Sequence, residues 1–123
     1  MSHITTSFTT TSSTGNRSLT GLGFQPAYIR LTVAQKNGTS ETFIHKSEGF
    51  TDGTNQGCTS IFWDSTGGKT VSFTDRVIDH INRVSGTLTD VIVATIVSLD
   101  ADGFTLNFST TTTSYRVFVE AWS

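Results

Sequence analysis

Aspartate, histidine and serine are the residue types in this chain that could form a catalytic group. Asp79 and His80 are adjacent, and serines occur throughout the sequence, so the parts of an imidazole-activated nucleophile are present. However, no sequence spacing brings a serine to His80, and no nucleophile elbow, phosphate-binding loop or His-Glu helix motif occurs. We therefore expect no catalytic residue and no cofactor, and a protein that is not an enzyme.

Metal binding requires several ligands at defined spacing, and neither the histidines nor the acidic turns meet this requirement. His3, His45 and His80 are widely separated; His45 and His80 could meet across a sheet, but a packed or surface histidine is the more common case. Residues 52–55 and 100–103 resemble calcium loops, yet neither has the distal bidentate glutamate, and Asp-Gly is mainly turn chemistry. We expect no metal site.

Polar loop residues near an aromatic side chain are the pattern of a shallow sugar site, where the ring stacks and the polar groups bond hydroxyls. The stretch from Ser47 to Gly57 holds three glycines together with Asp52 and Asn55, so we predict an exposed loop there. The candidate ligand-binding residues are Asp52, Asn55 and Trp63. For Trp63 we favour a place in the core, with the sugar site as the alternative.

Composition and charge indicate a single soluble β domain. The 123 residues fit one domain over residues 1–123, with residues 1–3 as a flexible N-terminus, and Thr, Ser, Gly and Asn are typical of strands and turns. A net charge of -2 without a block of like charges does not indicate a nucleic-acid partner. No apolar run approaches the roughly 18 residues of a membrane span, and no signal peptide is visible, so we expect no membrane insertion and synthesis in a cytoplasm. Cys58 cannot form an internal disulfide and is expected to be a small buried residue.

A stiff corner followed by a long alternating strand organises the predicted sheets. Gly21 and Gly23 allow backbone angles that other residues avoid, and Pro26 restricts the residue before it to extended conformations. From Ala27 to Gln35 apolar and polar residues alternate, which is typical of a strand with one buried face. Asn37-Gly38 predicts a type I′ hairpin into the next strand. Further strands are expected over residues 4–11, 17–20, 41–46, 58–63, 70–73, 91–99, 104–108 and 115–122.

Two other stretches lead to specific expectations. Residues 75–84 have apolar spacing compatible with one short helix, but Val77, Ile78 and Ile81 are β-branched, so we favour a strand and keep the helix as the alternative. Residues 91–99 are almost continuously apolar, which suits a central strand covered on both faces. Eight or nine short strands joined by turns predict an all-β fold, a single antiparallel β-sandwich or jelly roll.

The last predicted strand has one apolar face and one mixed face. Aromatic and charged side chains share the mixed face, which is unusual for a solvated surface and typical of a subunit contact. The alternative is that the aromatic residues lie under a neighbouring loop. The candidate oligomer-interface residues are Arg116, Phe118, Glu120 and Trp122.

Two stretches resemble virion proteins of tailed phages and prophages: TGNRSLTGLGFQPAYIRL, from Thr14 to Leu31, and LDADGFTLNFSTTTTSYRVFVEAW, from Leu99 to Trp122. Between them, GFTDGTNQGC is similar to the same group. The resemblance implies a β-sandwich that is a structural or adhesive part of the virion, decorating the capsid or belonging to the tail. It also implies a homo-oligomer, with a trimer favoured, that contacts other virion proteins.

The C-terminal hairpin, GFTLNF and YRVFVEAW, also resembles H-type lectins, which are small trimeric β-sandwiches that bind N-acetylgalactosamine-type sugars. The sugar-contacting positions of that family find no match in this chain, so none is assigned. We therefore expect a non-enzymatic structural protein located in the virion. The alternative is a lectin-like carbohydrate-binding module whose partner is a surface glycan.

Overall fold

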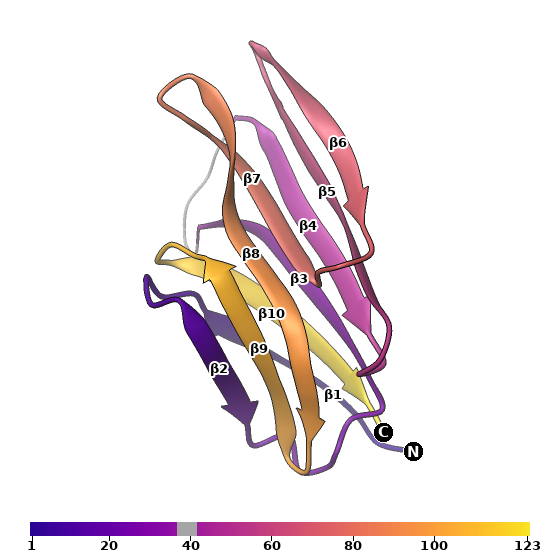
Figure 1. Ribbon diagram of the computed structural model, residues 1–123. Coiled ribbons are helices and arrows are strands. Elements are labelled where there is room, and N and C mark those ends of the chain that lie inside the picture. The colour runs from indigo at the N-terminus through magenta and orange to yellow at the C-terminus, as the bar shows by residue number, and fades with distance from the viewer. Residues whose placement is uncertain (37–41) are drawn as a thin grey trace.

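Two antiparallel sheets pack face to face in the computed structural model, which describes residues 1–36 and 42–123 (Figure 1). The expected β-sandwich is confirmed, with ten strands where eight or nine were expected. No helix occurs in the described residues, and residues 75–84 contribute a strand rather than the alternative helix. The strands are β1 (His3–Thr9), β2 (Gly15–Thr20), β3 (Tyr28–Lys36), β4 (Ile44–Thr51), β5 (Gln56–Asp64), β6 (Gly67–Phe73), β7 (Ile78–Val84), β8 (Thr87–Asp100), β9 (Gly103–Thr110) and β10 (Tyr115–Trp122).

The strand order brings the first and last strands together. The larger sheet has the order β1-β10-β3-β4-β5-β6, and the smaller sheet has the order β2-β9-β8-β7. The two chain ends therefore lie side by side, and the Ser123 N–H donates a hydrogen bond to the Ser2 carbonyl oxygen at 3.0 Å (Figure 1). The β1–β10 pair closes one edge of the larger sheet.

Alternation of side chains explains why the two sheets share one core. In β3, Ile29, Leu31 and Val33 point inward and are at most 1% exposed, as the period of two predicted. The inward face of β10 is buried in the same way. Removing this apolar surface from water is the main force that holds the sheets together. The smaller sheet contributes Ile78, Ile92, Ala94, Phe104, Leu106 and Phe108 to the same core.

The glycine corner ties the two sheets together at one end. Gly21 and Gly23 have positive φ angles of 91° and 82°, which glycine adopts without strain. Both of their N–H groups donate to the Asp102 carboxylate, at 3.0 and 2.6 Å respectively. Asp102 lies in the turn between β8 and β9, so the entry to β3 is fixed to the smaller sheet.

The expected loop from Ser47 to Gly57 is wrong. β4 continues to Thr51 and β5 begins at Gln56, so only residues 52–55 form the turn. The glycine at position 49 of this strand is required because the residue that precedes β7 passes directly over it: a Cβ atom there would lie 1.8 Å from the Val77 carbonyl oxygen. Close packing, rather than turn formation, explains this glycine. The hairpin expected at residues 37–38 lies outside the described residues.

β8 is not covered on both faces as its apolar composition suggested. Ile92 and Ala94 point into the core and are fully buried, whereas Val97 is 48% exposed. The reason is that a two-layer sandwich covers only the inner side of each sheet. No helix in the described part of the chain has the length and hydropathy needed to cross a membrane.

Candidate functional site: the outer face of the six-stranded sheet

The solvent-facing side of the six-stranded sheet, which we call the outer face, carries an unusual number of large apolar side chains. A sheet with one buried face normally has a polar outer side. Here four aromatic residues project into solvent from four adjacent strands. They are Tyr28 (37% exposed), Phe50 (44%), Trp63 (47%) and Phe118 (57%).

The candidate interface residues of β10 all lie on the outer face. Phe118 is not covered by a loop, since more than half of its surface is exposed. Its partners across the neighbouring strands are Ser7 and Thr32, whose small side chains leave the ring standing above the sheet. The Arg116 guanidinium donates to the Ser7 hydroxyl at 3.0 Å. Phe118 is thus a protruding apolar group in a polar setting.

A row of aromatic rings crosses four strands at one end of the outer face. The ring of His3 stacks on Trp122 with centroids 4.9 Å apart, and Trp122 contacts Tyr28 at 5.4 Å. Tyr28 in turn stacks near Phe50 at 6.3 Å with an interplanar angle of 20°. We call His3, Trp122, Tyr28 and Phe50 the aromatic row. Cross-strand aromatic contacts of this kind stabilise the sheet and hold each ring in place.

Phe50, at the end of the row, is positioned by a glycine. Gly57 is its cross-strand partner in β5, and a Cβ atom at Gly57 would lie 3.2 Å from Phe50 Cε1. The ring therefore lies against the backbone of β5 instead of beside a side chain. This placement presents Phe50 to solvent in a fixed orientation.

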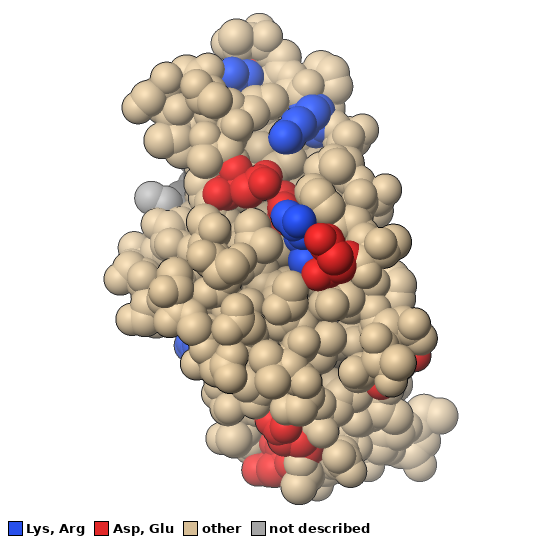
Figure 2. Space-filling view, in the orientation of Figure 1, with Lys and Arg blue, Asp and Glu red and all other residues tan. Residues whose placement is uncertain are grey.

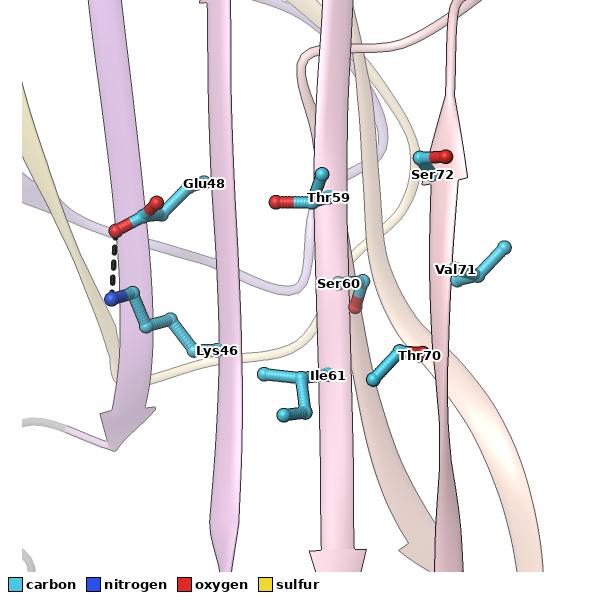
Figure 3. Close-up of a pocket in the computed structure, with 8 residues that line it drawn as sticks. All are labelled: Lys46, Glu48, Thr59, Ser60, Ile61, Thr70, Val71 and Ser72. Carbon is cyan, nitrogen blue, oxygen red and sulfur yellow. Dashed lines mark ion pairs between the residues drawn. The ribbon is translucent and has the colours of Figure 1, made fainter.

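Two adjoining depressions run from Phe50 along the outer face over β5 and β6. Their volumes are about 440 and 450 Å³, and both are lined by Glu48, Thr59 and Ser72, so they form one continuous hollow that we call the trough. Figure 3 shows its further part, with Lys46 and Glu48 on β4 and hydroxyl-bearing side chains on β5 and β6. The combined space is within the range of small-ligand sites, roughly 300–1,000 Å³.

Charges beside the trough are paired. The Glu48 carboxylate lies 2.7 Å from the Lys46 ammonium and 4.0 Å from the Arg30 guanidinium. The hydrogen bond from Lys46 lowers the pKa of Glu48, so this carboxyl is ionised at neutral pH. Elsewhere, the face seen in Figure 2 is largely uncharged, with basic and acidic groups intermixed. Neither the trough nor the face shown in Figure 2 has the cluster of cations that phosphate binding needs.

The structure does not bring the three candidate ligand residues together. Asp52 and Asn55 lie in the β4–β5 turn, where Asp52 Oδ1 accepts hydrogen bonds from the N–H groups of Thr54 and Asn55 at 2.9 and 2.6 Å. These bonds, with that from Asn55 the largest effect, lower the pKa of Asp52. Trp63 lies eight residues along β5 from Asn55, roughly 25 Å away at strand spacing. The favoured core position for Trp63 is wrong, since its side chain is 47% exposed.

Two buried histidines are in contact across the sandwich. The sequence allowed this contact, although a packed or surface histidine is the more common case. His45 of β4 and His80 of β7 are 5% and 0% exposed, and their Nδ1 and Nε2 atoms are 2.8 Å apart. Burial, and secondarily the nearby His45, lowers the pKa of His80 to about 3. His80 is therefore neutral at physiological pH.

Asp79 is a second buried ionisable group beside this pair. It is fully buried; its N–H donates to the Ser47 hydroxyl at 3.1 Å, and its carboxylate accepts from Arg76 at 2.8 Å. Burial, followed by the neighbouring Asp90 carboxyl group, raises the pKa of Asp79 to about 6.

Within the described residues, these buried groups do not form a catalytic triad. His80 bonds His45 through Nε2, and its Nδ1 has no hydrogen-bond partner among the residues that the structure describes. Burial raises the pKa of the Cys58 thiol to about 12, so it is a protonated, weakly nucleophilic group. Within residues 1–36 and 42–123, no three His, Cys, Asp or Glu side chains are grouped as metal ligands.

Comparison with protein-family models, curated proteins and solved structures finds no match to this chain. The trough of the outer face could have been found from the alternation in residues 44–50, where the aromatic and charged side chains fall on one side. That signal was hidden because the opposite, buried side of β4 is polar.

Proposed function

We propose that this chain is a non-enzymatic structural protein of a phage virion, in the capsid decoration or the tail, that works as a homo-oligomer. The observation that carries the proposal is Phe118, 57% exposed on the outer face of β10. The two sequence stretches that resemble phage and prophage virion proteins support it.

Phe118 has the surroundings of an interface anchor. Arg116 and Glu120 flank it on the same face of β10, so an apolar centre lies between charges of opposite sign. Interface cores are enriched in aromatic residues and arginine, with polar groups at the rim. A surface that carries both signs can also meet a second copy of itself, as symmetric oligomers require.

Light scattering after size-exclusion chromatography tests the assembly. We expect the mass of three 13.3-kDa chains, and a shift to monomer for Phe118→Ser. Val97→Ser is the matched control because Val97 is 48% exposed on the other sheet, and this variant should keep the wild-type mass. A wild-type protein that stays monomeric at millimolar concentration would overturn the proposal.

The neighbouring genes test the virion assignment. Flanking capsid, portal or tail genes support it, and immunogold labelling of the corresponding purified particles should then place the protein on the capsid or the tail. Particles that lack the protein would contradict the assignment.

A carbohydrate-binding module is the second candidate function. Asp52 and Asn55 give it no support, because they are engaged in their own turn. The trough favours it, since this hollow combines an exposed aromatic ring with hydroxyl groups and a paired carboxylate.

A further inference from the structure

We infer that the trough binds a linear, uncharged oligosaccharide chain that lies along β5 between Phe50 and Trp63. This inference rests on the second candidate function and specifies its site and ligand. It differs from the sequence-based expectation, which placed the ligand at the turn of residues 52–55.

The shape of the trough selects an extended ligand. It begins at Phe50, which lies opposite Gly57, and passes the cross-strand pairs Thr59–Ser72 and Ile61–Thr70. Trp63 projects from the outer face two residues beyond Ile61. Six residues of strand separate Gly57 from Trp63, which is roughly 20 Å. A single sugar would occupy only part of this length.

The floor of the trough offers hydroxyl groups. Thr59, Thr70 and Ser72 are all exposed, and their hydroxyls make no hydrogen bond within the described part of the chain. Hydroxyls both donate and accept, so they can match sugar hydroxyls in either sense. Three such groups on two adjacent strands form a polar strip beneath the ligand.

The charged groups beside the floor argue for an uncharged ligand. Glu48 is bonded to Lys46 at 2.7 Å, with Arg30 at 4.0 Å, so donors and an acceptor stand next to one another (Figure 3). An anionic chain would have to displace Glu48 from Lys46 and Arg30, and a cationic chain would have to displace these two cations from Glu48, so either would lose existing ion pairs. Neighbouring hydroxyl groups of an uncharged sugar can form hydrogen bonds with both the Glu48 carboxylate and the Lys46 ammonium while these two groups remain paired.

Aromatic rings at both ends supply apolar contact. Phe50 is 44% exposed, is backed by Tyr28, and is held over Gly57. Trp63 is 47% exposed and lies two residues beyond Ile61, the last residue of β5 that lines the trough. Sugar rings have apolar C–H faces, and burying them against a preplaced aromatic ring needs little reorganisation of the protein. The rings would fix the two ends of the chain while the hydroxyl strip holds its middle.

Isothermal titration with three neutral probes, maltohexaose, cellohexaose and chitohexaose, tests the inference. At least one probe should bind, and Phe50→Ala and Thr59→Val should each weaken that binding by about tenfold. Thr59→Val keeps the side-chain shape and removes only the hydroxyl. The control is Phe118→Ser, which lies outside the trough and should leave the affinity for the probe unchanged even if it dissociates the oligomer.

Each outcome decides a separate point. No binding of any of the three probes overturns the inference, whatever the oligomeric state. Binding that Phe50→Ala and Thr59→Val leave intact overturns the trough as the site but retains the carbohydrate-binding function. Binding of an anionic heparin hexasaccharide in place of the neutral probes overturns the charge argument. Chemical-shift changes confined to β3, β4, β5 and β6 would support the site directly.

Discussion

Asp79 and His80 are adjacent in the sequence, yet burial moves their pKa values in opposite directions. Folding raises the pKa of Asp79 from 3.8 to about 6 and lowers that of His80 from 6.5 to about 3. The stabilising contribution of protonated Asp79 is present at low pH and is lost as pH rises through about 6. That of neutral His80 is present above 6.5 and is lost as pH falls toward 3. Between pH 3.8 and 6 the two effects oppose each other.

Asp79→Asn should therefore expose a pH dependence that the wild type masks. The amide cannot take up a proton on folding. The proton that His80 releases on folding is therefore no longer offset by proton uptake at position 79. We expect the free energy of unfolding to fall with acidification below pH 6.5, with a limiting slope of about 1.4 kcal/mol per pH unit. Urea denaturation at several pH values between 4 and 7 measures this slope.

His80→Gln serves as the reciprocal control. It removes proton release and leaves uptake at Asp79, so the variant should gain stability as pH falls from 6 toward 4. Profiles for both variants that run parallel to the wild type would show that these two groups do not determine the pH response.

At the scale of the element, β4 is a strand whose buried side is polar or lacks a side chain. Its inward residues are His45, Ser47, Gly49 and Thr51, and β7 packs on them through hydrogen bonds and direct backbone contact. An ordinary apolar strand would be held by side-chain volume instead. The distance between β4 and β7 is therefore closely constrained.

Gly49→Ala is expected to lower the free energy of unfolding by at least about 2 kcal/mol, because β7 must move to admit the methyl group. The added Cβ would lie 1.8 Å from the Val77 carbonyl oxygen. Chemical denaturation measures the loss. Ser72→Thr, which adds one methyl group at an exposed strand position, should change stability by less than about 0.5 kcal/mol. Equal effects of the two substitutions would contradict the close-contact explanation.

The sequence correctly predicted those strands in which apolar and polar residues alternate regularly. β3, β9 and β10 alternate regularly, and their buried faces agree with the prediction. β4 and β5 were partly misread because Gly49 and Gly57 suggest turns, although they serve packing against Val77 and Phe50. A glycine's role in close approach depends on which strand lies opposite, and a single strand's sequence does not contain that information.

At the scale of the whole molecule, the sandwich has an apolar half and a polar half. The apolar core joins β3 and β10 to the smaller sheet, whereas β6, at the edge of the larger sheet, pairs with β5 alone. Two arginines of the β7 region reach toward this hairpin: Arg83 forms a two-bond contact with Asp64 at 2.7 and 3.0 Å, and the Arg76 guanidinium lies 3.9 Å from the Phe73 ring centre.

Hydrogen exchange followed by mass spectrometry should reveal these unequal halves. We expect amides of β6 to exchange through local opening, while those of β3 and β10 exchange only on global unfolding. Arg83→Gln should speed exchange in β6 and leave β10 unchanged, because the Asp64 contact is lost. Uniform protection across both regions would contradict this division.

The site was less predictable than the fold for the same physical reason. Arg116, Phe118, Glu120 and Trp122 were found because they alternate within one strand. The trough depends on the pairing of four strands, and the contact between His45 and His80 depends on the packing of two sheets. Such relations arise only when the chain is folded.

The pairing of β1 with β10 has a consequence for the newly made chain. Among the ten strands of the described residues, β1 leaves the ribosome before the others, and the strand that pairs with it, β10, is made after the others. At ordinary rates of translation, the roughly hundred residues between them take about 5–20 s to make. During that delay β1 has no partner strand, and its mostly Thr and Ser composition limits the apolar surface that it offers to other nascent chains.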